Sequence, residues 1–263
     1  MQDNDDGRMP IMAHLEELRK RILYSVIAVA VGFCVSFEFS ERLLAWMQIP
    51  LTMTVRFAAR APYIITSRVP SPARLIFIEP TEAFWMYMKI AAVAGVFLAL
   101  PFILAQVWLF VAPGLRPRER RYALPFVLSA TAMFVLGALF CQYLVLPMAI
   151  RFLLTFQTEN LTPMISVGRY VDFCSKFLLA FGVIFELPLI ITLLSRLGVV
   201  TPRFLSKNRK YAVLLAFIVA AILTPTPDAF NMSIMAAAIL LLYEAGIVMA
   251  RIIGRKREPP APA

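Results

Sequence analysis

The chain has 263 residues, of which 60% are hydrophobic and 16% are charged. This composition, with a mean hydropathy of +0.77, is too apolar for a soluble domain, and the chain is too long for a single span. The sequence therefore predicts a polytopic, all-α membrane protein. The net charge of +10 does not indicate nucleic-acid binding here, because the basic residues gather at the ends of apolar runs, where they meet anionic lipid.

Residues 10–21 are predicted to form an amphipathic helix that leads into the first membrane span, residues 22–39. Pro10 suits the first turn of a helix, and the apolar side chains that follow it recur at helical spacing. Two acid–base pairs are spaced four residues apart on the polar face of this helix: Glu16 with Lys20, and Glu17 with Arg21.

Residues 40–81 form the one connection of domain-like length, which we call the outer cap. It contains five prolines: Pro50, Pro62, Pro70, Pro72 and Pro80. Because proline interrupts both helices and sheets, we expect an irregular, outward-facing segment with at most short helical pieces, such as residues 41–48.

Three further spans are predicted over residues 83–111, 122–150 and 172–197. Lys89 lies near the outer end of the second span, and its amine is expected to extend to the interface. Asp172 and Lys176 are four residues apart near the start of the fourth span, so they are expected to pair with each other.

The last two apolar runs, residues 212–223 and 232–253, are predicted to be short. The first has fewer residues than a bilayer core requires, so the two form either a thin pair of spans or a re-entrant hairpin, and the sequence does not choose between them. With six segments, 17 Lys and Arg residues fall on the side of both termini and 7 on the other. The positive-inside rule therefore places both termini, including a flexible tail over residues 254–263, in the cytoplasm.

Residue types that support catalysis or metal binding are scarce. His14 is the single histidine, which leaves no partner for a serine or cysteine nucleophile and no histidine-rich metal site, so we do not expect an enzyme. Cys34, Cys141 and Cys174 lie in apolar segments and are expected to be small buried hydrophobes.

One acid, Glu186, lies in the middle of the fourth predicted span. Acids at this depth commonly mark an ion or substrate pathway, so a proton-coupled secondary transporter using Glu186 is the alternative function. Transporters commonly have broken helices in corresponding positions of two halves, and the sequence shows no such internal repeat.

Four separated motifs carry a resemblance to a known family. They are His-Leu-Glu-Glu-Leu-Arg-Lys-Arg before the first span, Phe-Val-Ala-Pro-Gly-Leu followed by Arg-Glu-Arg-Arg after the second, Phe-Gly-Val-Ile-Phe-Glu-Leu-Pro in the fourth, and Leu-Thr-Pro-Thr-Pro-Asp before the last. Together, and in this order over about residues 10–253, they resemble TatC, the membrane subunit of the twin-arginine protein translocase.

This resemblance implies a single integral membrane domain over residues 1–263, folded as a concave scaffold of six transmembrane helices in the bacterial cytoplasmic (inner) membrane. Such a scaffold recognises twin-arginine signal peptides. With single-span TatA- and TatB-type partners and other copies of itself, it exports folded proteins using the proton motive force. The resemblance implies no cofactor.

The resemblance also assigns residues to signal-peptide binding: Glu17, Arg19, Phe110 and Glu119. A ligand with two adjacent arginines needs carboxylates that accept paired guanidinium hydrogen bonds, a geometry that lysine does not reproduce. Three further positions match the family's pattern: Glu186 its intramembrane acid, Asp228 the acid of its last outer turn, and Pro50 an outer-loop proline.

Overall fold

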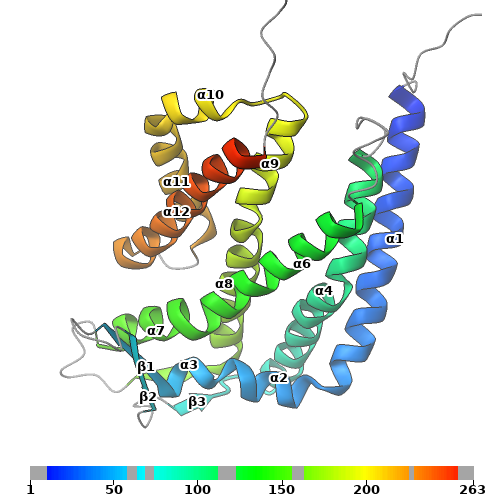
Figure 1. The fold of residues 1–263 in the computed structure, drawn as a ribbon. Coiled ribbons are helices and arrows are strands. Elements are labelled where there is room, and N and C mark those ends of the chain that lie inside the picture. The colour runs from blue at the N-terminus through cyan, green and yellow to red at the C-terminus, as the bar shows by residue number, and fades with distance from the viewer. Residues whose placement is uncertain are drawn as a thin grey trace, which may run out of the picture. The chain divides into compact units, whose positions relative to one another are not determined.

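The computed structural model describes residues 11–57, 64–68, 74–111, 123–155, 163–224 and 228–253. The chain forms two compact units, one of residues 1–39 and 91–131 and the other of residues 40–90 and 132–263. Figure 1 labels the helices: α1 (Ile11–Glu38), α2 (Ser40–Met47), α3 (Ile49–Thr52), α4 (Glu82–Val111), α6 (Ala123–Phe140), the π-helix η2 (Cys141–Val145), α7 (Leu146–Thr155), α8 (Val167–Phe185), α9 (Leu187–Arg196), α10 (Pro202–Lys207), α11 (Arg209–Leu223) and α12 (Ala229–Ile253).

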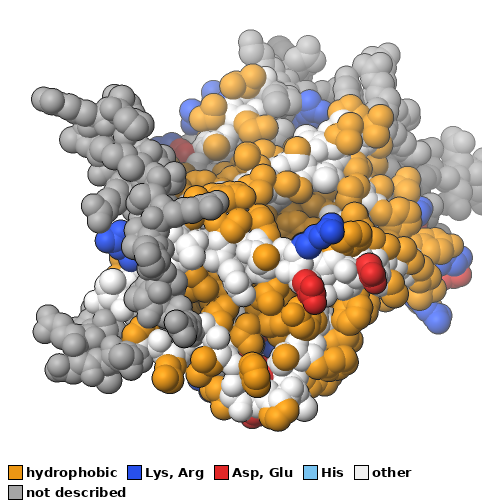
Figure 2. All heavy atoms as spheres, turned by 90° about the horizontal axis from the view of Figure 1, so that it is seen from below, with side chains coloured by type: hydrophobic (Ala, Val, Ile, Leu, Met, Phe, Trp, Pro, Cys, Tyr) orange, Lys and Arg blue, Asp and Glu red, His pale blue; other side chains and the backbone are white. Residues whose placement is uncertain are grey.

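Within the described ranges, five helical segments are long and apolar enough to cross a membrane. They are His14–Glu38, Glu82–Val111, Ala123–Thr155, Val167–Arg196 and Ala229–Ile252. Hydrophobic side chains cover much of the described surface on the face seen in Figure 2, where charged side chains are few. The prediction of a helical, multi-pass membrane protein is confirmed.

The two closing segments differ from each other in length. Helix α11 has 15 residues and is about 22 Å long, which is short of a bilayer core. Helix α12 has 25 residues, so the prediction that both are short is right for α11 and wrong for α12. The sequence predicted that this last apolar run begins at residue 232, but the helix begins at Ala229, because Asp228 caps its first turn and a hydropathy pattern does not detect such a cap.

The first unit consists of α1, residues 91–111 of α4 and residues 123–131 of α6. Helix α1 is continuous, so the predicted amphipathic segment and the first span form one helix, which runs alongside α4 (Figure 1). The two helices approach each other closely at two glycines, since a Cβ atom on Gly32 would lie 2.6 Å from the Gly95 carbonyl oxygen.

Replacing Gly95 with valine is expected to destabilise the first unit by about 1 to 3 kcal/mol, because a side chain there forces two helix backbones apart. Its Cβ atom would lie 2.6 Å from the backbone nitrogen of Phe33. Thermal unfolding in detergent measures the effect. Ala92→Val, at an exposed position of the same helix, is the control, and an equal loss in both variants would contradict this packing.

The second unit has its core around α8, which contributes the fully buried Phe177 and Phe181. Helix α9 packs on α12, and α11 packs on α12 as well. Cys141 and Cys174 are buried here, as predicted, whereas Cys34 of α1 is exposed, so that prediction was wrong for one cysteine.

The outer cap contains short strands as well as helices. Strand β1 (Met53–Phe57) pairs antiparallel with β2 (Ile64–Arg68), and β3 (Arg74–Ile76) pairs parallel with β4 (Met164–Ser166). Helix α2 matches the predicted helical piece, but the expectation of an otherwise irregular cap was wrong. Pro62, Pro70 and Pro72 lie outside the described residues, and the strands β1 and β2 contain β-branched residues, which favour strands.

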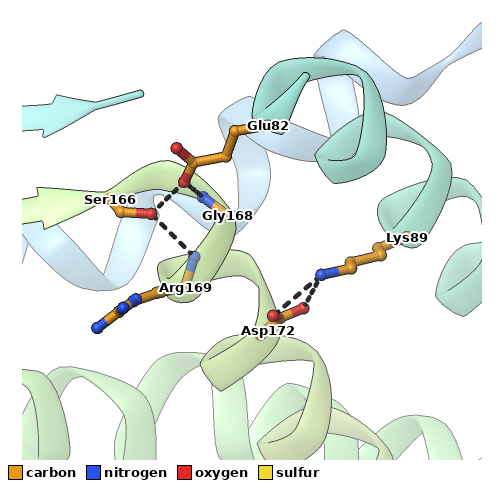
Figure 3. Close-up of polar contacts among 6 residues, drawn as sticks. All are labelled: Glu82, Lys89, Ser166, Gly168, Arg169 and Asp172. Atoms are coloured by element: carbon orange, nitrogen blue, oxygen red, sulfur yellow. Dashed lines mark hydrogen bonds and ion pairs between the residues drawn. The ribbon is translucent and has the colours of Figure 1, made fainter. Parts of the chain in front are cut away.

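Two side chains of α4, Glu82 and Lys89, contact the start of α8, as Figure 3 shows. The carboxylate of Glu82 accepts hydrogen bonds from the Ser166 hydroxyl and from the Gly168 backbone N–H, the latter at 2.8 Å, and so caps the N-terminus of α8. Asp172 pairs with Lys89 of α4 at 2.7 Å. Asp172 does not pair with Lys176, so that expectation was wrong. The amine of Lys89 meets the Asp172 carboxylate in a pair whose side chains are 45% and 42% exposed, and its place at the membrane interface stays a prediction.

Candidate functional site

A chain of polar contacts crosses from α1 to α4 within the first unit. Arg21 forms an ion pair with Glu17 at 3.1 Å, as its spacing predicted, and donates a second hydrogen bond to the side-chain oxygen of Gln106 at 3.1 Å. Gln106 is buried, while the side chains of Arg21 and Glu17 are 27% and 21% exposed. The guanidinium of Arg21 thus holds the Glu17 carboxylate in a fixed position that a ligand at the surface can still reach.

An aromatic contact lies beside this polar chain. The ring of His14 stacks on that of Phe110, with centroids 4.4 Å apart and planes 18° from parallel. Sequence reasoning assigned Phe110 to the site, included His14 in the first motif without assigning it to the site, and missed Gln106. His14, Glu17 and Arg21 are spaced three and four residues apart, so they share one face of α1, and that spacing could have grouped them.

A groove of about 380 Å³ runs between the same two helices. Its lining is mainly apolar, with Leu18, Ile22, Val26 and Val29 from α1 and Ile103, Val107 and Phe110 from α4. Arg21 and Gln106 also line it, so the polar chain borders the groove. The site therefore offers a carboxylate, an aromatic ring and an apolar channel to one ligand.

The other residues expected at this site are not all brought to it. Arg19 is exposed and, two positions from Glu17, faces a different side of α1. Glu16 pairs with Lys20 at 3.0 Å in a contact whose side chains are 67% and 63% exposed. Glu119 lies outside the described residues.

Glu186 lies in the second unit, at the junction of α8 and α9. Its backbone N–H donates to Val183 and its carbonyl accepts from Ile190, while Pro188 sits in the first turn of α9. The side chain is buried, and its Oε1 atom has no hydrogen-bond partner among the described residues. A buried acid with an unused acceptor is costly in an apolar setting, so Glu186 remains a candidate functional group.

Asp228 has a structural task at the start of α12. Its two carboxylate oxygens accept hydrogen bonds from the backbone N–H of Asn231 at 2.7 Å and from the side-chain amide of the same residue at 2.9 Å. This is the geometry of a helix N-cap. The position that the resemblance assigned to an outer-turn motif therefore also begins the last span.

Asp228→Ala is expected to lower the free energy of unfolding by about 0.5 to 2 kcal/mol, because the first turn of α12 loses its cap. Asp228→Ser should lose less, since a serine oxygen can cap the same amide. Thermal unfolding of both variants in detergent measures the difference. Equal loss in both would show that capping is not what the carboxylate contributes.

Comparison with known proteins places these features in a family. The family model described as "Sec-independent protein translocase protein (TatC)" matches residues 13–237. A protein of that name from Carboxydothermus hydrogenoformans is 40% identical over 252 residues, covering 96% of this chain and 97% of its own. Its counterpart from Koribacter versatilis is 39% identical over 248 residues, covering 94% of this chain and 87% of its own.

A solved structure is similar over nearly the same length. The crystal structure of a twin arginine translocase receptor, TatC, superposes with a TM-score of 0.76 at 35% sequence identity, covering 91% of this chain and 99% of that one. A second crystal structure of this receptor, in the detergent DDM, gives the same TM-score at 36% identity.

Proposed function

The chain belongs to the TatC family of Sec-independent protein translocase proteins, and from that membership we propose that it is the receptor subunit for twin-arginine signal peptides. Its substrates are then folded proteins that carry such peptides. Working with TatA- and TatB-type single-span subunits and with other copies of itself, it exports them using the proton motive force. As a translocase subunit it is a transport component and not an enzyme.

The observation that carries this proposal is the carboxylate of Glu17, which is held by Arg21, a residue that lines an apolar groove. A signal peptide has a charged segment followed by an apolar one. The arginines of the peptide can form ion pairs with the Glu17 carboxylate, and its apolar segment can bind in the groove between α1 and α4. Charge-assisted hydrogen bonds to a carboxylate discriminate arginine from lysine by geometry as well as by charge.

The proposed orientation in the membrane is supported by the distribution of charge. The excess of basic residues on the side of the termini supports cytoplasmic N- and C-termini in a bacterial inner membrane. Glu17 near the N-terminal end of α1 is then on the cytoplasmic side, where a newly made signal peptide arrives.

A proton-coupled secondary transporter remains the second candidate, and it is favoured by the buried Oε1 atom of Glu186, which has no hydrogen-bond partner in the part of the chain that the structure describes. The two functions differ in what the chain does alone. A transporter moves protons or a small solute in vesicles without partner subunits, whereas a receptor binds signal peptides but transports nothing by itself.

Site-specific crosslinking tests the proposal. A photoreactive residue at Val107, in the groove, is expected to crosslink to a twin-arginine signal peptide in membranes and much less to its twin-lysine version. The same residue at Leu241, an exposed position of α12, is the control. Equal crosslinking of the two peptides at Val107 would reject a twin-arginine receptor site there.

A further inference from the structure

Within the outer cap the helix is interrupted at Gln48, between α2 and α3, a point that we call the bend, and Pro50 in the first turn of α3 accounts for it. In a continuous helix the carbonyl of Trp46 would accept a hydrogen bond from the backbone N–H of residue 50, but proline has none. The next donor, the N–H of Leu51, bonds to Gln48 and not to Met47. The carbonyls of Trp46 and Met47 are therefore left without their helical partners.

Two side chains from distant parts of the second unit bind these two carbonyls. The Gln142 amide donates to the Trp46 carbonyl at 2.8 Å, and the Tyr170 hydroxyl donates to the Met47 carbonyl at 2.5 Å. Gln142 is fully buried and Tyr170 is 3% exposed. A buried carbonyl without a hydrogen-bond partner is costly, so losing either of these donors is expected to destabilise the fold more than losing an exposed hydrogen bond would.

Gln142 reaches Trp46 from a π-helix, η2, which interrupts the run from α6 to α7. A π-turn adds a residue to the helix and is frequent at functional positions. The next residue of the same turn, Tyr143, accepts a hydrogen bond from the Trp46 indole at 3.3 Å. Two successive side chains of this wide turn therefore contact the same tryptophan.

From these contacts we propose that Gln142 and Tyr170 are positioning residues for Pro50. They bind the two backbone carbonyls that the proline leaves open, and so they fix the bend from which the outer cap continues. Pro50 is itself fully buried, and α3 packs on α7 and η2. Pro50 removes a backbone hydrogen bond from the helix, and Gln142 of η2 and Tyr170 of α8 bind the carbonyls that are left without helical donors.

A double-mutant cycle tests the link between Gln142 and Pro50. Gln142→Met keeps the length of the side chain but removes the donor, and it is expected to lower the melting temperature in detergent by about 2 to 8 °C. Pro50→Ala restores the N–H that Trp46 lacks. The double variant is therefore expected to lose at least about 2 °C less than the sum of the single losses.

Tyr170→Phe provides a second, milder cycle, because it removes only a hydroxyl and keeps the ring. A regular turn in Pro50→Ala would allow Leu51 to donate to Met47, so this cycle should also be non-additive. In Gln142→Met and in Tyr170→Phe, the hydrogen-exchange rate of backbone amides should rise in α2 and α3 and stay unchanged in α12. Additive losses in both cycles would overturn the proposal.

Thr192→Val is the matched control within the same unit. The buried hydroxyl of Thr192 donates to the Pro188 carbonyl at 2.7 Å. The variant therefore also loses one buried hydrogen bond to a backbone carbonyl, but at a position far along the chain from the bend. Its loss should add to that of Pro50→Ala. Equal rescue of Thr192→Val would show that Pro50→Ala stabilises the protein in general, and it would overturn the proposal.

An export assay extends the test to function, and this step alone rests on the proposed translocase role. Tyr170→Phe should reduce export of a twin-arginine reporter while leaving signal-peptide affinity within twofold of the parent. Because the two cycles need no substrate, they decide the positioning roles even if the proposed function fails.

Discussion

Replacing Glu17 with glutamine is expected to weaken binding of a twin-arginine signal peptide about tenfold or more. A partly screened contact between arginine and carboxylate contributes roughly 1 to 3 kcal/mol, and each 1.4 kcal/mol is a factor of ten. Glutamine keeps the size of the side chain but loses the charge and one pair of acceptor sites. Glu17→Asp should weaken binding less, and Glu17→Lys should abolish it, as measured by affinity for a labelled peptide.

Glu16→Gln is the control for this result. It makes the same change one residue away, but Glu16 lies in a pair with Lys20 that is two-thirds exposed, so we expect less than a twofold change. Equal weakening by Glu16→Gln and Glu17→Gln would indicate a general effect of charge and contradict a site at Glu17.

Glu119→Gln is expected to act in the same direction as Glu17→Gln, because the motif it belongs to is assigned to the same ligand. The double variant should lose discrimination between twin-arginine and twin-lysine peptides. If discrimination survives in the double variant, the recognition site lies elsewhere.

Replacing Glu186 with alanine is expected to reduce export roughly tenfold while leaving signal-peptide affinity within twofold of the parent. The acid is buried at the junction of two helices, and its Oε1 atom accepts no hydrogen bond from the described residues. A charged carboxylate within a membrane span costs on the order of 3 kcal/mol, so we expect it to be kept for a function. Export of a twin-arginine reporter in membrane vesicles measures the effect, and peptide affinity is measured in parallel.

Glu186→Gln distinguishes the charge from the hydrogen-bonding capacity of this side chain. Partial export by Glu186→Gln would show that hydrogen bonding suffices, whereas export as low as in Glu186→Ala would show that an ionisable group is needed. Full export by Glu186→Ala would contradict any role of this acid in translocation.

Spacing along the sequence correctly predicted the ion pairs that form within one helix. The pairs of Glu16 with Lys20 and Glu17 with Arg21 were found as expected, because residues four apart on a helix are adjacent. Asp172 was assigned to Lys176 by the same rule but pairs with Lys89. Its true partner is on another helix, and no period in the sequence places two helices side by side.

The candidate site shows the same limit. Motifs assigned Glu17 and Phe110, but the contribution of Gln106 depends on α4 lying against α1, where it accepts a hydrogen bond from Arg21. The sequence analysis also missed Gln142, because nothing in the sequence pattern indicated its π-turn. Its partner is a backbone group, the Trp46 carbonyl, which lacks its helical donor because residue 50 is a proline. Pro50 was matched by motif alone, and the role that we propose for it rests on the contacts to the carbonyls of Trp46 and Met47.

The most direct test of the central claim is transport by the protein with its partners. Vesicles that contain this chain and TatA- and TatB-type subunits are expected to import a folded reporter that carries a twin-arginine signal peptide. Import should stop when an uncoupler removes the proton motive force, and it should fall strongly for the twin-lysine version. Equal import of both reporters, or import that persists with the uncoupler, would contradict the account.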